Sequence, residues 1–440
     1  MLMCPFPRHG LFALGRSLMF GLLLCVASPT LAGPSPDPAW FQPDSATDLL
    51  SLMAVVRDRA ASLQSDHLEV DVRRADAQQS RLFENPVLDA AVGTIPVGPI
   101  NPPDLPEPLR NVPNYSVGLG MHLDLARRSA RMERAELAVQ AADSQRSFAI
   151  RGQAISLLRA VGDLAVATLR FAADQRLTLQ ARQSLDLARE RVKTGFGPPL
   201  DADRAEIELL RLEQQVSADQ GDILSAQAAC AELVGMRCGA FPSEAGARQL
   251  LSRWIVFAEQ PPLQTEERAD LKALVIQQSV ASAEERLAQA VRIPDPTVRV
   301  GYTYDSFVAS GNQQHSMNVS VTLPLAFVDR GQAAIQAAQA RRLRYREQHR
   351  LMLAALGARA ESLRSALVSQ RLRMLQEQVL PRAQSILRDV RRAFEARAVP
   401  LTDLNQAQRA LDELQLQEAS ALADIFRLSV DLVELRGNHD

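Results

Sequence analysis

The sequence has few aromatic residues and almost no net charge. Phe, Trp and Tyr make up 5% of its 440 residues, which is little for a protein built around large compact cores. The 49 Lys and Arg residues nearly balance the 51 Asp and Glu residues, so the formal net charge is -2. Nucleic-acid-binding proteins carry a clear basic excess. We therefore expect no nucleic acid among the partners of this chain.

Long apolar runs are missing after residue 32. The one such run extends from Leu18 to Ala27, after a weakly basic start. Small residues follow it up to Ala32, which is the pattern of a secretory signal peptide. We predict that residues 1–32 are such a signal. A transmembrane anchor is the alternative, but the run is shorter than the ~20 apolar residues that span a bilayer.

Cysteines are also scarce. Of the four, Cys4 and Cys25 lie in the predicted signal peptide. A lipoprotein signal centred on Cys25 is a second interpretation, although the preceding Leu24 is bulky where a small residue is preferred. Cys230 and Cys238 lie eight residues apart. They could close a small loop as a disulfide in an oxidising compartment, and the alternative is two buried free thiols.

Motifs for catalysis or cofactor binding are missing as well. The six histidines include no pair at i, i+4 spacing, and no Cys-x-x-Cys motif occurs. The sequence has no phosphate-binding glycine loop and no nucleophile elbow. We therefore expect no enzyme, no cofactor and no metal ligands.

What the sequence does contain is one pattern written twice. Residues 114–126 and 314–326 share serine, leucine and alanine positions at an offset of 200. Each half is predicted to hold a helix, two strands, a long helix, a proline turn and a returning helix. We assign the first repeat to residues 33–235, a linker or equatorial segment to 236–264, and the second repeat to 265–440.

Alternating apolar and polar residues predict four strands. This period of two places the apolar side chains on one face of a sheet. Each segment is about as long as a tilted transmembrane strand. The segments lie at about 86–96, 114–125, 297–306 and 315–325.

These strands suggest either a soluble sheet with one buried face or a membrane-spanning sheet with one face toward lipid and the other toward water. Four strands cannot close a barrel, so three chains would be needed to supply twelve. On the polar face, His122 and Asp124 are predicted to face the lumen. A ring of three His122 side chains is the one metal-binding alternative, and a solvated side chain is the default interpretation.

Two long helical hairpins are predicted beside the strands, at residues 127–235 and 329–437. From Arg127 to Thr194 the chain has no proline, which allows about 100 Å of helix at ~1.5 Å per residue. Apolar residues there recur at gaps of three and four, as in a coiled coil. Pro381 interrupts the corresponding helix of the second repeat and is predicted to kink or split it.

The ordered set of strands and hairpins resembles the TolC-like outer-membrane efflux proteins over roughly residues 46–437. The segment that begins at Asn85-Pro86 and the turn from Gly195 to Asp201 look like those of the cation-efflux branch that includes CzcC and CusC. The resemblance implies a mainly α chain with a transmembrane β part. Three copies would form a twelve-stranded barrel in outer-membrane lipid and a coiled-coil helical tube in the periplasm.

The resemblance also implies partners and site residues. The hairpin tips would dock onto a periplasmic adaptor bound to an inner-membrane pump, with an RND-type pump expected. The docking residues would be Gly195, Pro199, Leu200, Pro400 and Leu401. The gate or tip residues would be Phe394, Arg397, Asp403 and Gln406. Gln406 departs from the family, which carries a second acid there, and Asp403 has the alternative role of stabilising a helix start.

The function implied is a passive exit duct of a tripartite efflux system, with heavy-metal cations as one cargo. A duct for drugs or other organic compounds, or for type I secretion, is the alternative. A periplasmic adaptor (membrane fusion) protein is an alternative of another class, but adaptors usually carry one hairpin rather than two. An enzyme or a soluble coiled-coil scaffold is the third hypothesis. The sequence has no motif that identifies the cargo.

Overall fold

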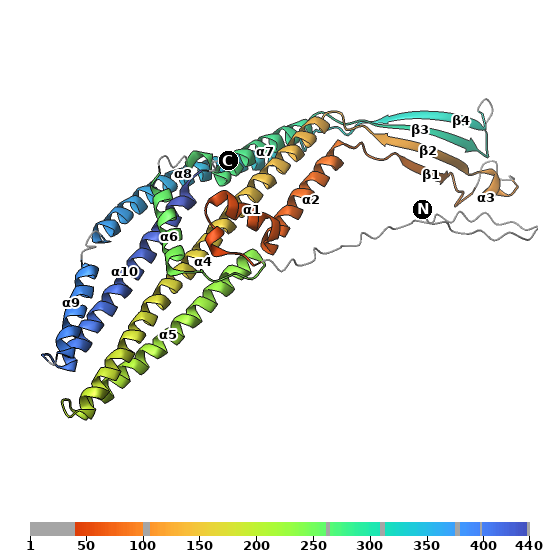
Figure 1. The fold of residues 1–440 in the computed structure, drawn as a ribbon. Helices are drawn as coiled ribbons and strands as arrows, with labels where there is room; N and C mark the ends of the chain where they lie inside the picture. The colour runs from red at the N-terminus through yellow and green to blue at the C-terminus, as the bar shows by residue number, and fades with distance from the viewer. Residues whose placement is uncertain are drawn as a thin grey trace, which may run out of the picture. The chain divides into compact units, whose positions relative to one another are not determined.

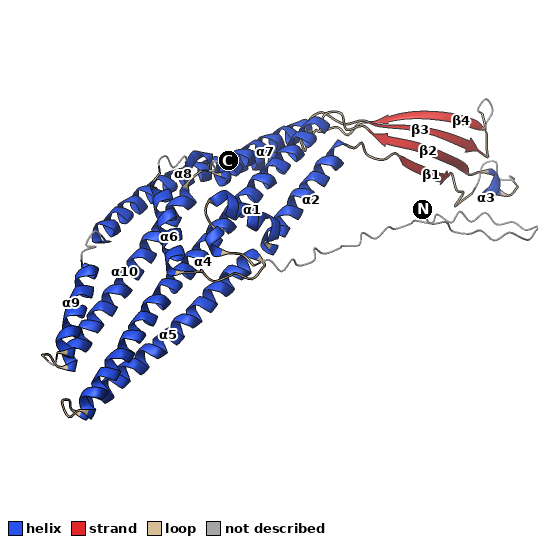
Figure 2. Cartoon of the chain, in the orientation of Figure 1, coloured by secondary structure: helices blue, strands red, loops and turns tan. Residues whose placement is uncertain are grey.

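The computed structural model describes residues 40–99, 106–260, 265–308, 313–374, 379–396 and 398–437. Residues 39–440 form one compact unit. Helices dominate it, and a four-stranded sheet extends beyond the ends of α2, α4 and α7 (Figures 1 and 2). The predicted signal peptide, with Cys4 and Cys25, lies outside the described residues.

Both repeats run from a helix through two strands into long helices, although the first has an additional helix α1 at its start and the short α3 between its strands. The first repeat contains α1 (Leu49–Arg59), α2 (Gln64–Arg81), β1 (Val87–Gly93), α3 (Pro108–Asn111), β2 (Asn114–His122), α4 (Arg128–Lys193) and α5 (Pro199–Val234). Helix α6 (Glu244–Glu259) follows. The second repeat contains α7 (Ala269–Ala290), β3 (Thr297–Asp305), β4 (His315–Thr322), α8 (Gln332–Met374), α9 (Val379–Glu395) and α10 (Leu401–Leu435). The predicted mainly α fold, with four strands and an internal repeat, is confirmed.

The long helices of the two hairpins are described differently. Helix α4 runs unbroken for 66 residues, whereas its counterpart is described as α8 up to Met374 and as α9 from Val379 onward. Pro381 lies in α9, close to residues 375–378, which are outside the described residues. The kink or split expected at Pro381 therefore stays a prediction.

The sheet is antiparallel, in the order β1-β2-β3-β4. Its register places equivalent apolar residues of all four strands in one row. Leu119 of β2 pairs with Leu88 and Val300, and Val300 pairs with Val319. All four side chains are exposed in the protomer, so the apolar face of the sheet is uncovered.

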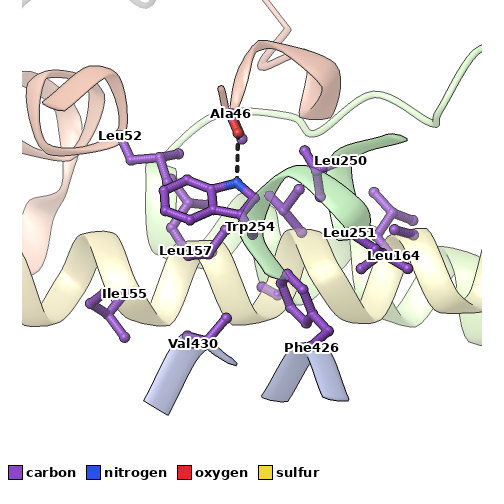
Figure 3. Packing of buried hydrophobic residues seen from close by; sticks show 14 of the residues in the cluster. Ala46, Leu52, Ile155, Leu157, Leu164, Leu250, Leu251, Trp254, Phe426 and Val430 are labelled. Carbon is purple, nitrogen blue, oxygen red and sulfur yellow. Dashed lines mark hydrogen bonds between the residues drawn. The ribbon is translucent and has the colours of Figure 1, made fainter. Parts of the chain in front are cut away.

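The main core lies where the two hairpins and the short helices meet. Trp254 of α6 is buried there, and its Nε1 donates a hydrogen bond of 3.0 Å to the carbonyl oxygen of Ala46 (Figure 3). Phe426 of α10 packs so closely on α4 that a Cβ added at Gly162 would lie 1.9 Å from its ring. A glycine is therefore required where these two long helices cross.

A disulfide joins Cys230, near the end of α5, to Cys238. Of the two interpretations of this pair, the structure has the bonded one. Gly235 between them ends α5 with φ +73°, a left-handed conformation that favours glycine. The loop closed in this way also receives the N-terminal segment, because Gly239 donates to the carbonyl of Phe41 and Phe41 donates to that of Arg237, both at 2.8 Å.

Among the described helices, none combines the length and the apolar character needed to cross a membrane.

Candidate functional site: the hairpin tips and the polar face of the sheet

The first hairpin tip is the turn between α4 and α5. Gly195 follows α4 with φ +77°, which turns the chain at little steric cost. Pro199 is the first residue of α5, where its fixed φ suits the helix. The N–H that proline lacks would have no partner within the helix at this position. Leu200 beside it is 53% exposed. The residues predicted for docking at this tip are therefore at its surface.

The second tip, between α9 and α10, is built differently. Pro400 precedes α10 as its N-cap, but Leu401 is only 1% exposed. The prediction that Leu401 belongs to a docking surface does not fit this burial. Arg397, predicted as a tip residue, lies outside the described residues.

Phe394 of α9 is also buried, although it was predicted at the gate. Its ring packs among apolar residues of both hairpins, and the guanidinium carbon of Arg191 lies 4.4 Å from the ring centre. The cluster comprises Leu185, Ala188, Ala205, Leu387, Phe394, Leu401, Leu404 and Leu411. Phe394 and Leu401 therefore fasten the second tip to the first hairpin, and neither lines an opening of the protomer.

Asp403 and Gln406 are the predicted gate residues that lie at the surface. Both side chains are exposed, and they stand three residues apart in the first two turns of α10, on one side of the helix. Asp403 lies in the first turn, where a carboxylate also interacts favourably with the helix dipole. The geometry is compatible with both roles considered for Asp403.

Ion pairs and polar contacts link the two hairpins above the tips. Arg409 of α10 donates to the carboxylate of Glu208 on α5 at 3.0 Å, and Arg211 of α5 donates to Asp412 of α10 at 3.4 Å. Burial alone would raise the pKa of Glu208, but hydrogen bonds from Arg211 and Arg409 outweigh it and lower that pKa. The second hairpin is thus held to the first by charge as well as by apolar packing.

Next to these links lies a pair of buried carboxyl groups. Asp174 of α4 is 1% exposed and hydrogen-bonds to Asp219 of α5, which is also buried. Burial, followed by the hydrogen bond and charge of Asp219, raises the pKa of Asp174 to about 7. The side-chain amide of Gln215 donates a hydrogen bond of 3.2 Å to Oδ1 of Asp219. Two carboxyl groups in contact favour a shared proton.

At the end of the sheet next to the helices, the two predicted lumenal residues have different surroundings. His122 ends β2, and its Nδ1 lies 3.2 Å from the hydroxyl of Thr297. Asp124 was predicted within the strand, but β2 ends at His122 and Asp124 is buried in an ion pair with Arg131. The prediction that Asp124 faces the lumen is not supported, because the carboxylate neutralises an arginine of α4. Asp295, paired with Arg127 at 3.1 Å, does the same from the second repeat.

Within the described residues, no group of three or more His, Cys, Asp and Glu side chains could hold a metal ion.

The comparisons with known proteins agree with this architecture. Residues 261–438 match the family model described as "Outer membrane efflux protein". The sequence likeness to this family therefore covers the part of the chain from α7 to α10, with the strands β3 and β4.

Solved structures have the same fold over nearly the whole chain. CusC is 15% identical and superposes with a TM-score of 0.70, covering 89% of this chain and 92% of its own. OprN, an outer-membrane channel, is 17% identical with a TM-score of 0.69, covering 91% and 94%. VceC of Vibrio cholerae, an outer membrane protein, is 19% identical with a TM-score of 0.68, covering 89% and 97%. None of the curated proteins compared matches the chain.

Sequence reasoning missed three features of this region: the buried cluster at the second tip, the Asp174–Asp219 pair, and an ion pair between Arg299 of β3 and Asp89 of β1 on the polar face of the sheet. The first two depend on which helices face each other across the hairpins. The third had a signal in the sequence, because Gly118 and Gly301 interrupt the strands where Arg299 needs room.

Proposed function

We propose that the chain is one subunit of a trimeric exit duct, which conducts cargo passively from the periplasm to the exterior. The observation that carries this proposal is the sheet, which has an uncovered apolar face, a polar opposite face and only four strands. An apolar surface of this kind is costly in water and favourable in lipid. The family match supports the same function.

Three copies are the number that fits the sheet. Strands β1 and β4 each pair on one side only within the described chain, so each leaves a row of backbone groups to satisfy. In lipid these groups must find partners, which closure with neighbouring chains provides. Three sheets of four strands give twelve, enough to enclose a water-filled lumen lined by the polar face.

The long hairpins would continue the duct into the periplasm. Their tips are the parts farthest along the helices from the strands, and the surface at Pro199 and Leu200 is suited to an adaptor that links the duct to an inner-membrane pump. For the cargo we favour heavy-metal cations, because three exposed Asp403 carboxylates around an opening would produce a negative potential there. Organic compounds are the second candidate cargo, since Gln406 adds no second charge.

The proposal is tested on the full chain expressed in a Gram-negative host. We expect it in the outer-membrane fraction, as a trimer in detergent that converts to monomers on heating, and as ion-conducting channels in planar bilayers. A protein released entirely with the soluble periplasm, monomeric and without conductance, would contradict the proposed duct.

A further inference from the structure

We propose that Arg299 and Asp89 form a charge-compensated ring inside the duct and that their balance sets its ion selectivity. This inference rests on the proposed function, because it places the polar face of the sheet toward the lumen.

The two residues pair across an intervening strand. Asp89 lies on β1 and Arg299 on β3, with β2 between them. The Nε of Arg299 donates to both carboxylate oxygens of Asp89, at 2.9 and 3.0 Å, and Nη2 donates to the same group. Such a multidentate pair has a fixed geometry as well as a favourable charge interaction.

Glycines make this crossing possible. A Cβ at Gly118 of β2 would lie 2.5 Å from Nη2 of Arg299, and one at Gly301 of β3 would lie 3.1 Å from Nη1. Gly118 and Gly301 are partners in the register, so the backbone between them is not covered by side chains on the polar face. The guanidinium lies directly over this backbone. Any residue with a Cβ at these positions would occupy the same space.

The pair continues into a polar belt that extends from β1 to β4, with residues from β1, β3 and β4. Nη1 of Arg299 donates to the side-chain oxygen of Asn318 on β4 at 3.3 Å, and the amide of Asn318 donates to Thr303 at 3.2 Å. The belt therefore consists of Asp89, Arg299, Asn318 and Thr303. Its charged members keep about a third of their side-chain surface exposed, 39% for Asp89 and 30% for Arg299, so they remain accessible from the polar face.

No other formal charge lies in the middle of the described strands. Asp305 and His315 lie at one end of the sheet, and His122 lies at the other. The belt thus contributes one positive and one negative charge per chain, which cancel. A ring of uncompensated charges inside a pore selects ions of the opposite sign. Removing either partner would leave three equal charges around the lumen.

The test is the reversal potential of the trimer in a planar bilayer that separates two KCl concentrations. Asp89→Asn leaves three arginines and should shift the reversal potential toward the chloride equilibrium potential. Arg299→Gln leaves three aspartates and should shift it toward the potassium equilibrium potential. The double variant Asp89→Asn/Arg299→Gln should return close to the unmodified protein, and it is the matched control for lost polar contacts.

Shifts of the same sign, or no shift in either single variant while the unmodified trimer conducts, would overturn the inference and leave the duct function standing. Absence of any trimer or conductance in the unmodified protein would instead refute the proposed function. If the charge variants fail to assemble, Gly118→Ala serves as the second test. Its Cβ would displace the guanidinium and should lower the dissociation temperature of the trimer, whereas Gly120→Ala, with its nearest neighbour at 3.9 Å, should not. Equal behaviour of the two alanine variants would also count against the bridge.

Discussion

The two hairpin tips carry the same Pro-Leu pair but place it in opposite surroundings. Leu200 of the first tip is 53% exposed, while Leu401 of the second is 1% exposed. In the strands, by contrast, the equivalent residues Leu119 and Val319 are both exposed. The repeats therefore share their secondary structure and their sheet face, but they differ where one hairpin packs on the other. An internal repeat predicts the local fold of a residue and not its neighbours.

The largest effect is expected at the tips themselves. Leu401→Ala removes a fully buried side chain from the cluster that fastens the second tip. It should lower the local stability of this tip by about 2–5 kcal/mol. Leu200→Ala changes an exposed residue and should cost less than about 0.5 kcal/mol. Limited proteolysis of the folded trimer at the tips measures the difference. Equal resistance of the two variants to the protease would contradict the difference between the two tips.

Substitutions on the apolar face of the sheet should instead have the same effect in both repeats. Leu119→Arg and Val319→Arg both place a charge on the apolar face, at a cost of about 2–4 kcal/mol near the centre of a bilayer. Both should reduce recovery of trimers from the outer-membrane fraction. Ser316→Arg, on the polar face of β4 opposite Thr303, is the matched control and should assemble. A normal yield of both apolar-face variants would show that this face is not toward lipid.

A smaller effect is expected from the buried acid pair, which the first repeat has and the second lacks, since Met374 stands at the position equivalent to Asp174. The pKa of Asp174 is raised from 3.8 to about 7, so between these values the folded protein binds more protons than the unfolded one. Stability is then full at low pH and falls as the pH rises through about 7.

Asp174→Asn should remove this decline, which we expect to be about 2 kcal/mol between pH 5 and pH 8. The measurement is the thermal unfolding of the helical part, followed by circular dichroism at both pH values. Asp163→Asn, at an exposed position of the same helix, provides the control. A decline that persists in Asp174→Asn would assign it to other groups.

The smallest effect concerns Asp403. Replacing it with alanine removes three exposed charges and should reduce block of the single-channel current by divalent cations. Asp201→Ala, which removes the acidic residue in the first turn of α5, should leave the block unchanged. If Asp403→Ala leaves the block intact, the carboxylate has only the helix-dipole role.

Much of the fold could be predicted because it follows from short-range patterns in the sequence. Alternation in β2, β3 and β4 and the proline-free length of α4 each follow from residues close together in the chain. The candidate site could be predicted only in part. The burial of Phe394 and Leu401 depends on contact with the other hairpin, and Asp124 is buried where it forms an ion pair with Arg131 of α4. No periodicity within a segment carries that information.

The loop closed by Cys230 and Cys238 has a consequence for the order in which the chain folds. Phe41 and Ala46 are among the first described residues, yet their backbone groups bond to the loop after α5 and to Trp254 of α6. These partners are synthesised much later than the segment that they hold. The residues around Phe41 and Ala46 therefore cannot dock until the chain has been made at least as far as Trp254 of α6.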